Sequence, residues 1–350
     1  NTPINNNIIL DTSKIDLVID EIKRLTNKNI VTILSHQSEN NSLDKVEIYI
    51  RKKLNKNQNQ NLTILENTKL LKGETEKPSN KDYKNLVKYF SQFGEEYIND
   101  AFQTMHRNYA SVVGLPLYFK KLNRKVSMGT FSKKEIKKLS KFTSNLNNKK
   151  NKNLLILGGA KVETKLNIAL KLLKNNIKIF ISGVSANHIL KEILNINIGN
   201  SFIEKNFSIN KKDSKIIKEA IKDNRIIVPI DAILNDKSVS LIEKINSNQS
   251  ICDIGPATLA LLKKEINNSN TIIMNGTLGI YKDGFDSGTK ALLKELNKAN
   301  KNTIIGGGDT MTIFNKLKIK NNKINSTTAG GAMLDFLSKD CKLPGILALK

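Results

Sequence analysis

The sequence of 350 residues contains no tryptophan, only two cysteines and only three histidines, and these shortages exclude several classes of protein. Two cysteines cannot build the disulfide framework of a small secreted module or a four-cysteine zinc site. The histidines are far apart and form no HExxH pattern, which argues against a zinc hydrolase. No run approaches the roughly 18 apolar residues of a membrane span, and no signal-peptide pattern opens the chain. We therefore expect a cytoplasmic protein without a membrane partner.

Acidic residues are also scarce, since 32 aspartates and glutamates face 57 lysines and arginines, for a formal net charge of +25. Such an excess suits nucleic acid or a strongly anionic small substrate. It also follows from compositional drift, because the chain is rich in asparagine, lysine and isoleucine together. We favour drift, since the sequence shows no RNA-binding aromatic motif and no zinc finger. A nucleic-acid partner remains the weaker alternative.

A chain of this length exceeds what one hydrophobic core supports, so two domains are expected. Apolar residues at helical spacing predict a helix over 15–25, and a second helix is predicted near 132–142. Short apolar runs predict strands at 30–34, 62–65 and 97–98, the first of them buried on both faces. The N-terminal half is therefore interpreted as βα units, with the domain boundary in the Asn- and Lys-rich stretch that follows the second helix.

The C-terminal half is more regular. Its short apolar runs, separated by helix-length amphipathic segments, predict a doubly wound parallel sheet. The predicted strands are 154–157, 177–181, 226–228, 251–254, 271–274 and 303–305. Ligands of such sheets bind beyond the carboxyl ends of the strands. Four of these six ends carry glycine-rich or polar residues, namely Gly158–Lys161, Asp253–Pro256, Asn275-Gly276 and Gly306–Asp309.

The run Gly306–Thr310 follows a predicted strand and opens a predicted helix. Glycines there leave backbone N–H groups unobstructed at a helix N-terminus, which favours an anion such as phosphate. Asp309 can cap the helix or hold a magnesium ion that accompanies the phosphate. Taken alone, the run is equally an ordinary tight turn with an aspartate cap. It is not a Walker A loop, because no GxxxxGK[ST] occurs in the chain.

The run Gly158–Lys165 has the same placement between strand and helix. The spacing of Lys161 and Lys165 predicts that both ammonium groups lie on one helix face, where they repel unless an anion lies near them. A solvated lysine pair is the alternative, but the double glycine favours phosphate. His106-Arg107 is a weak candidate for carboxylate or phosphate capture. His188, in a helical stretch beside apolar residues, is predicted to be structural.

Taken in order along the chain, these segments resemble the motifs of the phosphoglycerate kinase family, and the resemblance covers essentially the whole chain. Each piece is short, and the shared order and spacing carry the resemblance. The pieces are Leu65–Asn67, Tyr97–Arg107, Ala110-Ser111, Gly114, Gly158–Lys165, Asp253–Pro256, Asn275-Gly276, Gly279, Gly288–Lys290, Gly306–Thr310, Gly330–Ala332 and Leu343–Gly345.

The resemblance implies an α/β fold of two Rossmann-like doubly wound parallel-sheet domains joined by a hinge. It implies reversible phosphoryl transfer between 1,3-bisphosphoglycerate and ADP, giving 3-phosphoglycerate and ATP, in a monomer that requires Mg²⁺. The implied ranges are 1–130 for 3-phosphoglycerate binding, 131–150 for an interdomain helix and linker, 151–325 for nucleotide binding, and 326–350 for a segment returning to the hinge and the N-terminal domain.

The resemblance also assigns roles to residues. Lys165 matches the lysine that stabilises the transferring phosphoryl group, and Lys161 matches one that holds nucleotide phosphates. Asp309 matches the magnesium-associated carboxylate. The remaining nucleotide-binding positions are Asn275, Gly307, Gly308 and Thr310, of which Gly307 also belongs to the catalytic set with Lys14 and Gly331. The positions expected to bind the glycerate substrate are Asn1, His36, Lys69 and Arg107.

Several positions depart from the family pattern. The chain begins at Asn1, so the family's first strand and its aspartate are expected to be missing. Lys14 and Lys69 stand where the family has arginines, and Lys keeps the charge but loses the planar fork. Glu39 replaces a third arginine, while the nucleotide side carries two further replacements, Lys282 and Val184. These departures predict a working but impaired kinase. The alternative is a non-catalytic descendant that keeps nucleotide binding or a scaffold role.

Overall fold

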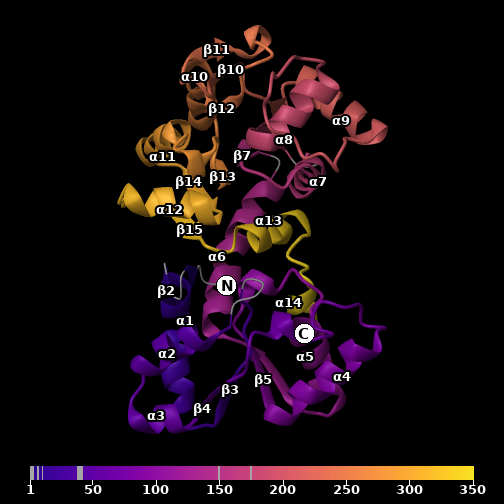
Figure 1. Cartoon of the computed structure of the whole chain (residues 1–350), viewed down its shortest axis with the longest axis vertical. Coiled ribbons are helices and arrows are strands. Elements are labelled where there is room, and N and C mark those ends of the chain that lie inside the picture. Colours follow the sequence, from indigo (N-terminus) through magenta and orange to yellow (C-terminus); the bar gives the residue numbers. More distant parts are fainter. Residues whose placement is uncertain (1–3, 6–7, 10, 38–41, 149, 174–175) are drawn as a thin grey trace. The chain divides into compact units, whose positions relative to one another are not determined.

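The computed structural model of the chain describes residues 4–5, 8–9, 11–37, 42–148, 150–173 and 176–350 (Figure 1). The chain forms two compact units, of which unit 1 is Asn1–Lys138 with Lys342–Lys350 and unit 2 is Leu139–Cys341. The division falls inside helix α6, Thr130–Asn147. The domain ranges given by the resemblance remain a prediction. None of the helices in the described ranges combines the length and the apolar character needed to cross a bilayer.

Unit 2 is built on a six-stranded sheet with the order β15-β14-β13-β7-β8-β9, in which all neighbours are parallel. Its strands are β7 Asn153–Leu157, β8 Ile177–Ile181, β9 Ile226–Ile227, β13 Thr271–Asn275, β14 Asn302–Gly306 and β15 Ile324–Thr327. The chain winds outward from β7 through β8 to β9, and then outward from β13 through β14 to β15. The winding direction therefore reverses between β7 and β13, the place where doubly wound sheets bind ligands.

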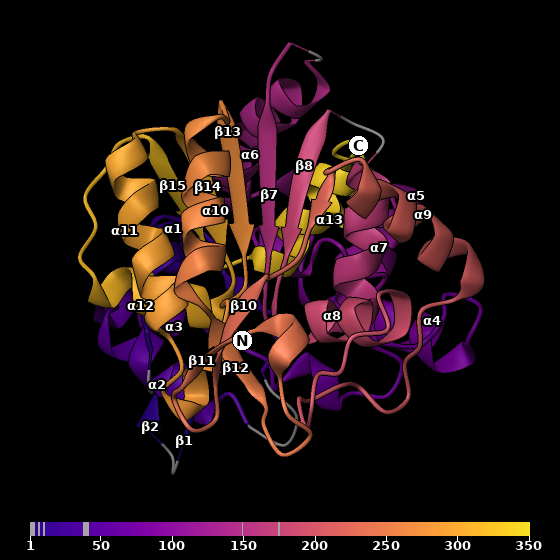
Figure 2. The same ribbon diagram turned by 90° about the horizontal axis from the view of Figure 1, so that it is seen from above.

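Helices cover both faces of this sheet (Figure 2). They are α7 Val162–Leu172, α8 Gly183–His188, α9 Lys211–Lys222, α10 Pro256–Asn267, α11 Ser287–Ala299, α12 Gly308–Lys316 and α13 Gly330–Ser338. Alternate strand residues such as Leu154, Ile156 and Met274 pack in one core with side chains of α10, α11 and α12. Because both faces are buried, the strands are continuous apolar runs, and for this reason the sequence located β7, β8, β13 and β14 correctly.

The assignment of 251–254 to the parallel sheet was wrong. Strand β12, Ile251–Ile254, pairs antiparallel with β10, Asp231–Leu234, which also pairs with β11, Val239–Leu241. A short apolar run does not indicate which sheet it joins. The carboxylate of Asp253 consequently caps a helix instead of ending a parallel strand, and it accepts hydrogen bonds from the Gly288 N–H at 2.8 Å and the Ser287 hydroxyl at 3.2 Å.

Unit 1 is also α/β. Its strands form two parallel pairs, β3–β4 and β5–β6, and one antiparallel pair, β1–β2. The strands are β1 Ile4–Asn5, β2 Ile8–Ile9, β3 Val31–Ile33, β4 Leu62–Ile64, β5 Glu96–Asn99 and β6 Lys125–Met128. The helices are α1 Ser13–Thr26, α2 Asp44–Lys52, α3 Lys56–Gln60, α4 Lys81–Phe90, α5 Leu115–Lys121 and α14 Pro344–Leu349. The expectation that 30–34 is buried on both faces was wrong, since Ile30 is 84% exposed and β3 is half-buried.

Candidate functional site

Glycine-rich turns from β7 and β13 meet at the reversal point of the unit 2 sheet. The Gly158 N–H donates to the Asn275 carbonyl oxygen at 2.9 Å. A Cβ at Gly158 would overlap the Thr277 carbonyl oxygen, and one at Gly276 would overlap the Gly158 carbonyl oxygen. Gly276 also has a φ of +95°, a region that side chains disfavour. Only glycine therefore allows these two turns to approach so closely.

The turn after β14 and the start of α13 join the same group. Gly307 has a φ of +112°, and a Cβ at Gly330 would lie 2.6 Å from the Gly307 nitrogen and from Asn275 Nδ2. At Gly308, by contrast, a Cβ would meet nothing within 4 Å, so the first turn of α12 opens to solvent. Gly331, the next residue of α13, is exposed. The structure thus brings Gly307 and Gly308, the glycines predicted to bind nucleotide, to the sheet edge where the turns at Gly158 and Gly276 meet.

Lys165 places a positive charge at this edge of the unit 2 sheet. Its side chain is 7% exposed, and its ammonium group donates to the Asn275 carbonyl oxygen at 3.1 Å and to Asn275 Oδ1. Burial and, to a smaller extent, the positive charge of Lys161 together lower the pKa of Lys165 to about 7. A cation that is costly to bury therefore lies among the glycine turns, where an anion would stabilise it.

Several buried polar atoms at the glycine turns have no hydrogen-bond partner among the described residues. They include Asn275 Nδ2, Thr310 Oγ1 and Ser182 Oγ. Buried polar groups are nearly always paired, so such a cluster indicates a ligand that supplies the partners. Because Asn275 Nδ2 is a donor and both hydroxyls can donate, oxygen atoms of a phosphate are suitable partners.

The two lysines of the run 158–165 do not share one helix face, contrary to the prediction. Lys161 precedes the first turn of α7 in a left-handed conformation, with φ 69° and ψ 62°, and is exposed, whereas Lys165 is buried. The start of α7 already binds a carboxylate, since the N–H groups of Lys161 and Val162 donate to Glu204 Oε1 at 3.0 and 3.2 Å. An anion would therefore interact with the ammonium groups of this run and not with the start of the helix.

Asp309 is the candidate magnesium ligand, and its surroundings fit that role. Within the described ranges no group of three or more His, Cys, Asp or Glu residues could hold a metal by itself. Asp309 is exposed in the first turn of α12, beside the orphaned hydroxyl of Thr310. Mg²⁺ is usually held by one or two carboxylates together with substrate phosphates and water, so a single exposed carboxylate at an anion-attracting helix start suits it.

Two of the predicted glycerate-binding residues, His36 and Lys69, lie in unit 1 on loops that hydrogen bonds tie together. His36 follows β3 and Lys69 follows β4. The two loops are joined because the Thr68 N–H donates to the Ser35 carbonyl at 3.0 Å. In addition, Asn67 Oδ1 accepts from the backbone N–H groups of both loops, at 2.9 and 3.1 Å.

A buried carboxylate that the sequence analysis missed, Glu74, connects these loops to a third segment. Its Oε1 lies 2.6 Å from His36 Nε2 and 2.5 Å from the Ser111 hydroxyl, and its Oε2 accepts from the Ser111 N–H at 3.0 Å. The His36 ring also meets Tyr109 edge-on, with the centroids 4.9 Å apart. Glu74 therefore holds His36 in place. The sequence offered no local signal for Glu74, because its partners His36 and Ser111 lie 38 and 37 positions away.

The other unit 1 candidates are less constrained. Arg107 is exposed in the loop before Tyr109. Lys14 lies in the first turn of α1, where burial lowers its pKa while the charge of Asp11 opposes that shift. Asn1 and Glu39 lie outside the described residues.

We expect Glu74→Ala to lower the free energy of unfolding by about 3–5 kcal/mol, because it removes a buried acceptor from three donors. Glu74→Gln keeps one side-chain oxygen and should lose less. Urea denaturation measures both. Glu76→Ala, at an exposed carboxylate of the same loop, is the control and should change the stability by less than about 0.5 kcal/mol. Equal losses in Glu74→Ala and the control would contradict the structural role.

Comparisons with known proteins agree with this geometry. The sequence profile of a family described as phosphoglycerate kinase matches residues 43–340. A phosphoglycerate kinase of Thermosipho africanus is 33% identical over 300 residues, which cover 82% of this chain and 70% of that protein. One from Mycoplasmoides gallisepticum is 29% identical over 100% of this chain and 94% of its own length. The solved structure of phosphoglycerate kinase from Coxiella burnetii has a TM-score of 0.76 at 28% identity, over 100% of this chain and 93% of that one.

The fold and family predicted from the sequence are thereby confirmed, together with the phosphoglycerate kinase function that the family carries. The orphaned polar atoms and the buried lysine at the sheet reversal have the chemistry that a kinase of this kind needs. The chain belongs to the phosphoglycerate kinase family.

Proposed function

We propose that this chain catalyses reversible transfer of a phosphoryl group between 1,3-bisphosphoglycerate and ADP, giving 3-phosphoglycerate and ATP. It is then a phosphotransferase with a carboxyl group as acceptor. The observation that carries the proposal is the buried ammonium group of Lys165 among glycine turns whose neighbouring donors lack partners. Phosphoryl transfer needs alignment and positive charge around the equatorial oxygens, and little covalent chemistry from the protein.

The nucleotide is assigned to unit 2. Asn275 Nδ2 and the Thr310 hydroxyl would donate to phosphate oxygens, and the start of α12 at Gly307 and Gly308, where the Gly308 Cβ position is open, would bind a terminal phosphate. Lys161, exposed beside the site, would pair with the outer phosphates. Asp309 would hold Mg²⁺, which when bound supplies further positive charge to the phosphate oxygens. Lys165 would neutralise the charge that develops on the transferring group.

The glycerate substrate is assigned to unit 1, to His36, Lys69 and Arg107 with Asn1. Lys14 and Lys69 offer point charges in place of the planar fork of arginine, so we propose weaker binding of this substrate than a complete arginine set would give. The lowered pKa of Lys14 further reduces its charge at alkaline pH. By family resemblance we place the chain in the cytoplasm as a monomer.

The test is a coupled assay that follows ATP consumption with 3-phosphoglycerate as the acceptor and varied Mg²⁺. Turnover by the full chain is the expected result, and its absence would reject the proposed function. Asp309→Asn should raise the Mg²⁺ concentration for half-maximal rate by at least about tenfold, because it removes a charged ligand. The control is Asp223→Asn, at an exposed carboxylate that ends α9. An unchanged Mg²⁺ requirement in Asp309→Asn would contradict the assignment of the metal.

A further inference from the structure

The carboxylate of Glu204 occupies the start of α7, although Glu204 lies 43 positions further along the chain. One oxygen, Oε1, accepts the N–H groups of Lys161 at 3.0 Å and Val162 at 3.2 Å. A helix start carries partial positive charge and unpaired N–H groups, so a carboxylate stabilises it. Glu204 thus supplies the capping that the Lys161 side chain does not provide.

This capping matters because of the backbone that it holds. Lys161 is in the left-handed region, which is unfavourable for a residue other than glycine. The conformation persists only where the surroundings enforce it. The two hydrogen bonds to Glu204 enforce it. If the Lys161 backbone left the left-handed region, both N–H groups would move away from the Glu204 carboxylate. The direction in which the Lys161 side chain leaves the turn depends on this backbone.

Glu204 is itself fixed by buried neighbours. Its own N–H donates to His188 Nε2 at 3.0 Å, so the proton of that ring lies on Nδ1, which is 2.5 Å from Glu192 Oε1. The other oxygen of Glu192 accepts the Ile209 N–H at 2.8 Å. The His188 side chain is fully buried, in agreement with the structural role predicted for it. These contacts fasten the segment 202–209 at both ends.

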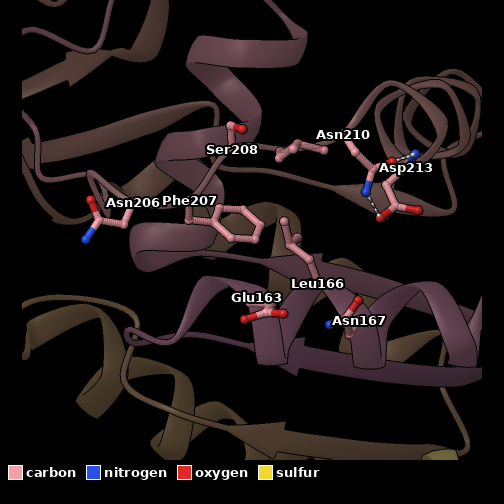
Figure 3. A pocket seen from close by; sticks show the side chains of 9 residues that line it. Glu163, Leu166, Asn167, Asn206, Phe207, Ser208, Asn210 and Asp213 are labelled. Carbon is pink, nitrogen blue, oxygen red and sulfur yellow. Dashed lines mark hydrogen bonds between the residues drawn. The ribbon is translucent and has the colours of Figure 1, made fainter.

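Packing along this segment is uneven. Figure 3 shows a hollow between α7, with Glu163, Leu166 and Asn167, and the segment that carries Asn206 and Phe207. Its volume is about 410 Å³. Phe202 is 61% exposed. The polar contacts of Glu204 and Glu192, together with Ile203 on a hydrophobic core and Phe207 edge-on to His188, locate the segment against the start of α7.

We infer that Glu204 is a positioning residue for nucleotide binding: it enforces the left-handed turn that directs Lys161 to the nucleotide phosphates. The inference rests on the proposed function for the role of Lys161, and it goes beyond it by assigning a part to a residue outside the glycine turns. Glu204 touches the backbone of the turn and is not itself assigned to the substrates.

The experiment compares the full chain with Glu204→Ala and Glu204→Gln. Glu204→Ala should weaken MgADP binding, measured by calorimetry, by about tenfold, and should raise the KM for MgATP while the KM for 3-phosphoglycerate stays unchanged. Glu204→Gln retains a side-chain oxygen as acceptor and should restore most of the affinity. Lys205→Ala, at the exposed neighbour, is the matched control and should bind MgADP as the unaltered chain does. In hydrogen exchange, the amides of Lys161 and Val162 should be protected in the unaltered chain and lose protection in Glu204→Ala.

Equal affinity for MgADP in Glu204→Ala and the unaltered chain would overturn the inference. Tighter binding in Glu204→Ala would also overturn it, and would make the carboxylate a competitor of the phosphates. Failure of the proposed function is a different result, namely absence of turnover in the coupled assay. Calorimetry and hydrogen exchange do not depend on turnover, so the two failures are distinguishable.

Discussion

Lys165→Ala is expected to lower kcat for phosphoryl transfer by about 10³-fold, the largest effect on activity that we predict. The alanine removes an ammonium group that is buried at the sheet reversal and hydrogen-bonded to Asn275. No water-exposed cation can replace it, because a charge in a site that excludes water acts far more strongly than one in solvent. The coupled assay measures the loss. Lys171→Ala, at an exposed lysine of the same helix, is the control. A Lys165→Ala rate within tenfold of the control would contradict the catalytic role.

The pKa of Lys165 adds a dependence on pH. With a pKa of about 7 in the ligand-free protein, the amine is charged below that pH and neutral above it. Because the charged form is the one that binds phosphate, kcat/KM for the nucleotide should decline as the pH rises above 7. In Lys165→Arg the guanidinium stays charged, so the residual activity should lack this decline. A decline of the same midpoint in Lys165→Arg would assign it to another group.

The same lowered pKa affects stability, with the opposite sign. Between about pH 7 and the ordinary value of 10.5, the unfolded chain binds a proton at Lys165 that the folded chain does not. The free energy of unfolding therefore gains from this group as the pH rises through that range. Subtracting the pH dependence of Lys165→Met from that of the unaltered chain isolates the contribution, and urea denaturation measures it.

Gly276→Ala is expected to destabilise the protein by more than about 3 kcal/mol and to abolish nucleotide binding. Two costs combine at this position. The φ of +95° disfavours any side chain, and the new Cβ would overlap the carbonyl oxygen of Gly158. The turn cannot yield without moving Asn275, whose carbonyl oxygen accepts from both the Gly158 N–H and the Lys165 ammonium group. Urea denaturation and calorimetry with MgADP measure the two effects.

Variants at two other glycines distinguish the backbone cost from the steric cost. Gly284 has a φ of +84° but nothing within 4 Å of its Cβ position, so Gly284→Ala should show the backbone cost alone, roughly 1 kcal/mol. Gly308 has neither feature, and Gly308→Ala should leave the unfolding free energy unchanged within about 0.5 kcal/mol. If Gly276→Ala were no less stable than Gly284→Ala, the close approach of the two turns would be disproved.

Short apolar runs located the strands that are buried on both faces and also the half-buried β3, β4 and β5, but they did not find every strand or its sheet. Strand β15, Ile324–Thr327, was missed because it is mostly half-buried and three of its four residues are polar. Strand β12 was found but placed in the wrong sheet, since pairing partners are chosen by long-range contacts. Tertiary context decides both features.

Motifs likewise supplied the candidate site residues, but not the residues that hold them in place. Lys165, Asn275 and Thr310 were predicted, and the structure gathers them at one sheet edge. Glu74 and Glu204 were not, because each acts on residues more than 35 positions away and has no local pattern of its own.

The sequence by itself determined the α/β class, the strands with two buried faces, the glycine turns and the family. These follow from local requirements: an apolar run needs burial, and a left-handed or crowded turn needs glycine. Only the tertiary structure decided that β7 and β13 lie side by side, that Lys165 is buried while Lys161 is exposed, and that two distant carboxylates hold the loops that carry His36 and Lys161. The reason is physical, since strand order, desolvation and hydrogen bonding between remote segments exist only once the chain has folded.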